Sequence, residues 1–107
     1  MKNLTQMLQQ AQQMQSKVAE MQQRLQEVEV TGVSGGGMLE ARMNGKGELL
    51  RLKIDPALVD PNEVEVLEDL VTAAVNDGRA KAEALAREEM QKLTGGLELP
   101  PGMSLPF

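Results

Sequence analysis

Three basic residues near the start of the chain could carry out the simplest chemistry in this sequence, which is the binding of phosphate groups. They are Lys2, Lys17 and Arg24, and Glu20 is the acid that opposes them. Lys17 and Arg24 are seven residues apart, so a helix would place them near one face. Duplex nucleic acid is bound first through its phosphates, which makes these cations candidate contacts. Nearby amides could add hydrogen bonds to phosphates or base edges: Gln6, Gln10 and Gln13.

A second basic group lies nearer the other end of the chain. Its members are Arg79, Lys81, Arg87 and Lys92, and the acids Glu83, Glu88 and Glu89 are interspersed with them. Both groups have an alternative interpretation as solvated helix surface, since a Lys four residues from a Glu usually forms an exposed pair. We expect Arg42, Arg51 and Lys53 to be cross-strand partners rather than DNA contacts. Phe107 is the single aromatic residue, which argues against stacking on single-stranded bases and favours double-stranded DNA as the partner.

The chain lacks the two residue types most often used in acid–base catalysis and transition-metal binding. There is no His and no Cys, so the commonest general base, the thiolate nucleophile and the usual transition-metal ligands are absent. Glu68 and Asp69 are adjacent, and consecutive helix residues point about 100° apart, so these carboxylates would not converge on one substrate. The glycines at 35–37 and 45–47 lack the phosphate-loop pattern. We therefore expect no enzyme activity, no catalytic or metal-binding residue, no cofactor and no small-molecule substrate.

Charge is segregated along the chain. The formal net charge is −5, from 11 basic and 16 acidic residues. No basic residue falls within 55–77, where seven acids gather: Asp55, Asp60, Glu63, Glu65, Glu68, Asp69 and Asp77. The rest of the chain carries a slight excess of positive charge. An acidic protein of this kind can still present a local positive face.

An apolar heptad pattern predicts one long helix over residues 3–27. It contains no Gly or Pro, and its seam has two series of residues: Leu4, Ala11, Val18 and Leu25, and Met7, Met14, Met21 and Val28. A seam with this strict spacing suits a narrow helix–helix contact. The helix would be roughly 35–40 Å long, more than a small domain needs, so we expect part of it to project. The pattern leaves open whether the seam closes within one chain or between two.

Alternation of apolar and polar residues predicts three strands between residues 27 and 54. The alternating segments are 28–31, 39–43 and 50–54, and the glycine-rich residues 32–37 form the first turn. Asn44-Gly45 predicts a hairpin with residues 44–47 as its loop. This loop implies the following cross-strand pairs: Ala41–Leu50, Leu39–Leu52 and Glu40–Arg51. The result is a three-stranded antiparallel sheet with one apolar face and one charged face.

A second long helix is predicted over residues 61–93. Asp60 suits the N-cap, Pro61 the first helical position, and Glu63 completes a capping box. Gly78 lies inside this helix, where it costs roughly 1 kcal/mol relative to Ala or allows close packing. The residues at 94–96 form a C-cap, and the Pro-rich residues beyond form an extended tail. The order is α-β-β-β-α, an α+β fold, with one domain at 1–96 and a tail at 97–107.

Several short motifs are spread over nearly the whole chain. They are Gln-Ala-Gln-Gln-Met at 10–14, Val30-Thr31-Gly32 followed by Ser34-Gly35, Asn44-Gly45, Ile54-Asp55-Pro56, Leu67-Glu68-Asp69-Leu70-Val71 with Ala74 and Asn76-Asp77, Leu99-Pro100-Pro101-Gly102-Met103, and Leu105-Pro106-Phe107. In their order and spacing they resemble the YbaB/EbfC family of bacterial nucleoid-associated proteins. The resemblance implies a tweezer-like homodimer whose sheets meet centrally and whose helices project as arms. It also implies binding of double-stranded DNA, alteration of DNA conformation, and roles in nucleoid organisation and gene regulation.

We expect no signal peptide and no membrane segment, because Lys2 leads into a Gln-rich stretch and no window approaches about 20 apolar residues. We therefore expect a cytoplasmic, nucleoid-associated protein with no membrane partner. One alternative function is a prefoldin-like chaperone, which eight Met residues and long helices would suit. Another is an adaptor that binds a DNA-repair or replication protein through the acidic residues 55–69. Burial of the methionines would argue against the chaperone, and five are predicted to be buried: Met7, Met14, Met21, Met43 and Met90.

Overall fold

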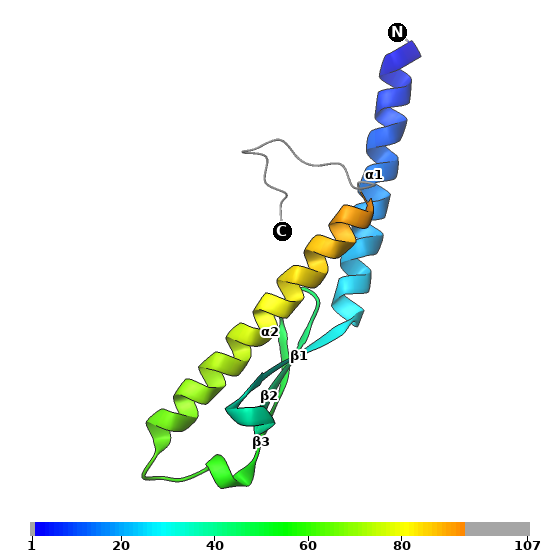
Figure 1. Ribbon diagram of the computed structural model, residues 1–107. Coiled ribbons are helices and arrows are strands. Elements are labelled where there is room, and N and C mark those ends of the chain that lie inside the picture. Colours follow the sequence, from blue (N-terminus) through cyan, green and yellow to red (C-terminus); the bar gives the residue numbers. More distant parts are fainter. Residues whose placement is uncertain (1, 94–107) are drawn as a thin grey trace, which may run out of the picture.

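The computed structural model describes residues 2–93, and Figure 1 shows how they are arranged. The elements, in chain order, are helix α1 (Lys2–Glu27), strand β1 (Glu29–Ser34), the 3-10 turn η1 (Gly35–Gly37), strands β2 (Leu39–Asn44) and β3 (Leu49–Ile54), the 3-10 turn η2 (Pro56–Leu58) and helix α2 (Val64–Leu93). This order confirms the predicted α-β-β-β-α fold of the α+β class. The predicted C-cap at 94–96 and tail at 97–107 lie outside the described residues.

The strands form an antiparallel sheet in the order β1-β2-β3, and α2 packs on one face of it (Figure 1). β2 is the middle strand, so its inward side chains Leu39, Ala41 and Met43 are fully buried and pack with Ala74 of α2. Helix α2 lies mainly over β1 and β2. Strand β3 is covered least, and three of its leucines are exposed: Leu49, Leu50 and Leu52.

Strand β1 passes so close to α2 that the contact is made by glycines. Gly32 is buried, and a β-carbon there would overlap the Ala74 carbonyl oxygen and the Gly78 nitrogen. The predicted role of Gly78 in close packing is confirmed, because its backbone lies against Gly32 and a β-carbon on Gly78 would lie 3.1 Å from the Met43 side chain. The prediction that Gly32 belongs to the turn is wrong. The turn is made by glycines 35–37, all of which have positive φ.

The β2–β3 hairpin has a different register from the predicted one. From Leu39 to Arg42, each residue of β2 faces a β3 residue two positions later than expected, as the observed pairs show: Leu39–Ile54, Glu40–Lys53, Ala41–Leu52 and Arg42–Arg51. The predicted pairs Ala41–Leu50, Leu39–Leu52 and Glu40–Arg51 are therefore wrong. The side-chain alternation of both strands is preserved, because a shift of two residues returns each side chain to the same face.

The loop and a β-bulge together explain this shift. The Asn44 side-chain oxygen accepts the backbone N–H groups of Lys46 and Glu48, both at 3.0 Å, so residues 45–47 form a three-residue loop. Gly47 has a φ of 84°, the left-handed conformation that such a loop needs at its last position. A bulge between Arg42 and Met43 then adds one more residue on β3. The shorter loop and the bulge each move the register by one residue.

Helix α2 begins at Val64, three residues later than predicted. Asp60 closes a turn instead of capping a helix at Pro61: its carboxylate accepts the Asn62 N–H at 2.9 Å, and its carbonyl oxygen accepts the Glu63 N–H at 3.0 Å. Local bonds of this kind compete with helix formation. The predicted capping box is therefore wrong.

The heptad seam of α1 closes within the chain at its C-terminal end. Met21 and Leu25 are buried together with Met90 of α2, and half-buried residues of α2 complete the cluster: Leu85, Ala86 and Leu93. The Gly45 N–H also donates to the Leu25 carbonyl oxygen at 2.7 Å, which attaches the hairpin to the end of α1. The sequence did not decide whether the seam packs within one chain or between two. For the C-terminal half of α1, its partner is α2 of the same chain.

The first half of α1 projects away from the rest of the molecule, as expected (Figure 1). All side chains from 3 to 17 are exposed. Met7 and Met14 are 63% and 44% exposed, so their predicted burial is wrong, whereas that of Met21, Met43 and Met90 is confirmed. The reason is that α2 reaches only the last turns of α1.

Two side chains of α2 occupy the free edge of β1. Asp77 accepts the Val33 N–H at 2.9 Å, and the Lys81 ammonium donates to the Thr31 carbonyl oxygen at 2.8 Å. Asp77 and Lys81 also form an ion pair at 3.0 Å. An added strand would need these same backbone groups, so the edge of β1 is blocked. The Val33 N–H, followed by Lys81, holds the pKa of Asp77 below its usual value of 3.8.

Replacing Asp77 by asparagine is expected to lower the free energy of unfolding at neutral pH, because the bonds to Val33 and Lys81 lose their charge. Since the pKa of Asp77 is lowered by folding, its stabilisation is present above the usual value of 3.8 and is lost as the pH falls through the folded-state value. The difference in stability between wild type and Asp77→Asn should therefore disappear in acid. Urea unfolding at a series of pH values measures it, and a constant difference down to about pH 2 would contradict this account.

Candidate nucleic-acid interface

One face of α1 carries five of the predicted DNA-binding residues: Gln6, Gln10, Gln13, Lys17 and Arg24. Their spacing keeps them within one narrow stripe of the helix, and all five are exposed. Glu20 lies in the same stripe, and no charged residue occurs from 3 to 16. The stripe is thus polar on the projecting half of α1 and cationic towards α2. The backbone of Lys2 opens the helix, but its side chain lies outside the described part of the chain.

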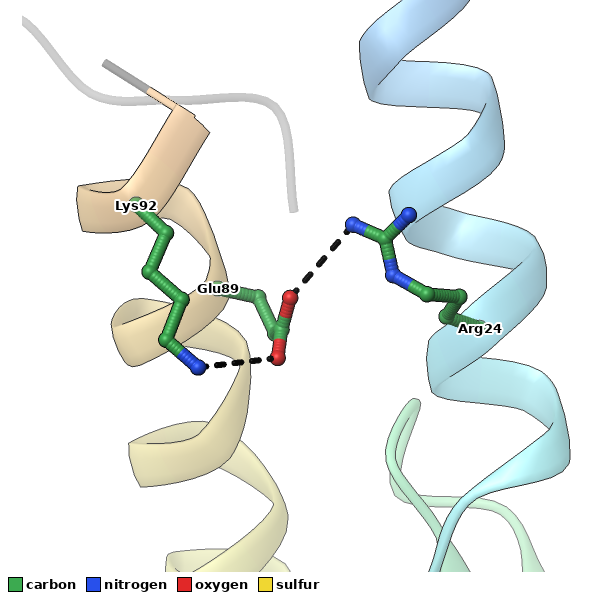
Figure 2. A network of polar contacts seen from close by, with 3 residues as sticks. All are labelled: Arg24, Glu89 and Lys92. Atoms are coloured by element: carbon green, nitrogen blue, oxygen red, sulfur yellow. Dashed lines mark hydrogen bonds and ion pairs between the residues drawn. The ribbon is translucent and has the colours of Figure 1, made fainter. Parts of the chain in front are cut away.

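Arg24 meets α2 through a carboxylate that it shares with a second cation. Figure 2 shows Glu89 between Arg24 and Lys92, with N···O distances of 3.5 Å and 3.7 Å. The Arg24 side chain remains 55% exposed. Exposed ion pairs of this length are worth no more than about 1 kcal/mol, so a phosphate can compete for the guanidinium. One carboxylate is thus shared between a cation of α1 and a cation of α2.

The predicted cations of α2 do not share one face. Arg79 and Arg87 are exposed, and neither forms an ion pair with another residue of 2–93. Lys81 is two residues from Arg79, which places it about 200° around the helix. Its ammonium is held at the β1 edge by Thr31 and Asp77. Lys81, like Arg24, is therefore a predicted contact whose charge already has a partner.

Within residues 2–93, no three His, Cys, Asp or Glu side chains come together as possible metal ligands. None of the helices described has the length and apolar character needed to cross a membrane.

Sequence comparison identifies the family of this α-β-β-β-α chain. The profile of the YbaB/EbfC DNA-binding family matches residues 1–97. The chain belongs to this family. Full-length relatives of this YbaB/EbfC protein include a nucleoid-associated protein of Paramagnetospirillum magneticum, 65% identical, and one of Rhodospirillum rubrum, 55% identical, each aligned over 100% of both chains.

A solved structure has the same fold. The crystal structure of an uncharacterized protein from Helicobacter pylori superposes on this YbaB/EbfC chain with a TM-score of 0.76 and 26% sequence identity. The match covers 85% of this chain and 96% of the other. The arrangement of two helices around a three-stranded sheet is therefore shared by distant sequences.

Proposed function

We propose that this protein binds double-stranded DNA through the exposed stripe of α1 and acts as a nucleoid-associated protein. The observation that carries the proposal is the projecting half of α1, a helix with no charge from 3 to 16 that presents amides and then cations to solvent. Membership of a DNA-binding family and the names of the full-length relatives support it. Roles in altering DNA conformation, nucleoid organisation and gene regulation in the cytoplasm follow from the same proposal.

The working unit in this proposal is a tweezer-like homodimer joined at β3. The edge of β1 is blocked by Asp77 and Lys81, whereas β3 is an unpaired edge strand. Leu52 pairs with Ala41, whose side chain is buried against α2, so Leu52 belongs to the same face but lies beyond the cover of the helix. An exposed apolar edge strand favours pairing with another chain. Two chains joined here would present two α1 arms.

Binding to a labelled random-sequence duplex, measured by fluorescence anisotropy across a salt series, tests the proposal. Four phosphate contacts in each chain of a dimer would give a slope of log K against log salt of roughly −7. Replacing Lys17 and Arg24 by alanine removes four cations from the dimer, so the slope should become shallower by between about 3 and 4. Lys46→Ala, which removes an exposed cation at the hairpin tip, is the control and should change the slope least. Failure to bind at low salt and micromolar protein would contradict the proposal and favour a protein partner.

A further inference from the structure

The observed register brings together like charges on the open face of the sheet. Arg42 of β2 lies directly opposite Arg51 of β3. Side chains opposite each other on neighbouring strands have β-carbons roughly 4.5–5.5 Å apart, and like charges in such pairs are destabilising. Lys53 lies two residues beyond Arg51, on the same face, so three cations cluster there. The predicted pairing of Arg51 with Glu40 would have avoided this repulsion.

None of these three cations forms an ion pair with another residue of 2–93. The ion pairs formed among residues 2–93 all lie on α1 and α2. Glu40 lies opposite Lys53, yet its carboxylate does not reach any of the three cations within ion-pair distance. Arg42, Arg51, Lys53 and Leu52 line an open surface hollow of about 330 Å³. The bulge next to Arg42 twists the strands at this point, as bulges beside functional sites do.

A bound anion would turn this repulsion into attraction. Guanidinium groups bind phosphate oxygens through paired N–H donors, and two of them on adjacent strands can approach one phosphate from both sides. We propose that this hollow is a second binding site for the phosphate backbone of DNA, separate from the α1 stripe, which lets one assembly hold two duplexes. This inference rests on the proposed DNA-binding function.

The separation of the two surfaces explains why the second site would bridge DNA. The projecting half of α1 and strand β3 lie towards opposite ends of the molecule (Figure 1). A duplex held along the α1 stripe would leave the sheet surface available to another duplex. Joining two β3 edges would also bring two such hollows side by side. Their repulsion would favour an anion between them.

A capture experiment tests the bridge. An immobilised duplex is loaded with protein, and retention of a second, labelled duplex is measured for wild type, Arg51→Gln and the charge-matched control Lys46→Gln. We expect Arg51→Gln to lower retention of the second duplex by at least about tenfold, with a smaller effect on binding to the first. Lys46→Gln should behave as wild type. The melting temperature of Arg51→Gln should equal or exceed that of wild type, because the like-charge pair is relieved.

The outcomes separate this inference from the function on which it rests. A wild-type protein that binds no DNA contradicts the proposed function. A wild-type protein that binds one duplex but retains no second one overturns only the second site, as does an Arg51→Gln variant that bridges as well as wild type. A loss of bridging accompanied by dissociation of the dimer in sedimentation also overturns it, since Arg51 would then act through assembly.

Discussion

Replacing Gly32 by alanine is expected to destabilise the fold by about 3 kcal/mol or more, at the upper end of the range for overpacked sites. A β-carbon at this position would overlap backbone atoms of Ala74 and Gly78 and lie 2.8 Å from the Gly78 α-carbon. Backbone cannot rotate away as a side chain can, so β1 and α2 would have to separate. That movement would also stretch the bond between Val33 and Asp77, which is now 2.9 Å. A loss of this size is a large part of the total stability of a small domain.

Urea unfolding followed by circular dichroism measures the effect, and Gly36→Ala is the matched control. Gly36 has a φ of 66°, and a β-carbon there would meet nothing within 4 Å. The control variant therefore carries only the backbone penalty of a left-handed residue, about 1–2 kcal/mol. Equal losses for the two variants would show that the close approach of β1 to α2 is not what requires Gly32.

Replacing Leu50 by glutamate is expected to convert the proposed dimer to folded monomers. Leu50 is the extra residue of the bulge and is 52% exposed in the single chain, so the monomer loses little core packing. At an interface formed by β3, the added carboxylate would be buried without a partner, which costs several kcal/mol. Sedimentation at micromolar concentration would report the change in mass. The monomer would retain half of the phosphate contacts, so the salt slope of DNA binding should fall from roughly −7 to about half that value.

Leu8→Glu is the matched control for this experiment. Leu8 is 59% exposed on the projecting half of α1, so the substitution adds the same charge at a similarly exposed leucine. We expect this variant to remain a dimer. A dissociated Leu8→Glu variant beside an intact Leu50→Glu dimer would place the interface on the projecting half of α1 instead of on β3.

Local sequence patterns predicted the elements correctly but not all of their junctions. Heptad spacing identified α1, and alternation identified the three strands, because each pattern reflects which side of one element faces the core. The register of β2 and β3 was wrong because it depends on Gly47 adopting a positive φ and on a bulge beside Arg42. The predicted start of α2 was wrong because the Asp60 carboxylate accepts the Asn62 N–H and forms a turn before the helix begins.

The candidate interface also combines features that residue spacing predicts with features that only the tertiary structure shows. The stripe from Gln6 to Arg24 is a property of one helix, so its spacing alone places these residues on one face. The partner of Lys81 is a carbonyl oxygen of β1, 50 residues away in the chain, and spacing within α2 says nothing of it. The pairing of Arg42 with Arg51 likewise depends on the register of the hairpin. Alternation of apolar and polar residues cannot fix this register, because a shift of two residues leaves the alternation unchanged.

The sequence by itself determined the order of elements, the projecting polar helix, the absence of His and Cys, and the family, because these follow from local periodicity, composition and ordered motifs. Only the tertiary structure decided which half of the α1 seam is buried, which strand edge is blocked and which cations face each other. The facing of Arg42 and Arg51 depends on the loop and bulge of the hairpin. The other two features depend on where α2 crosses the sheet. That crossing is set by the close approach of Gly32 to Gly78, a contact between residues far apart in the chain.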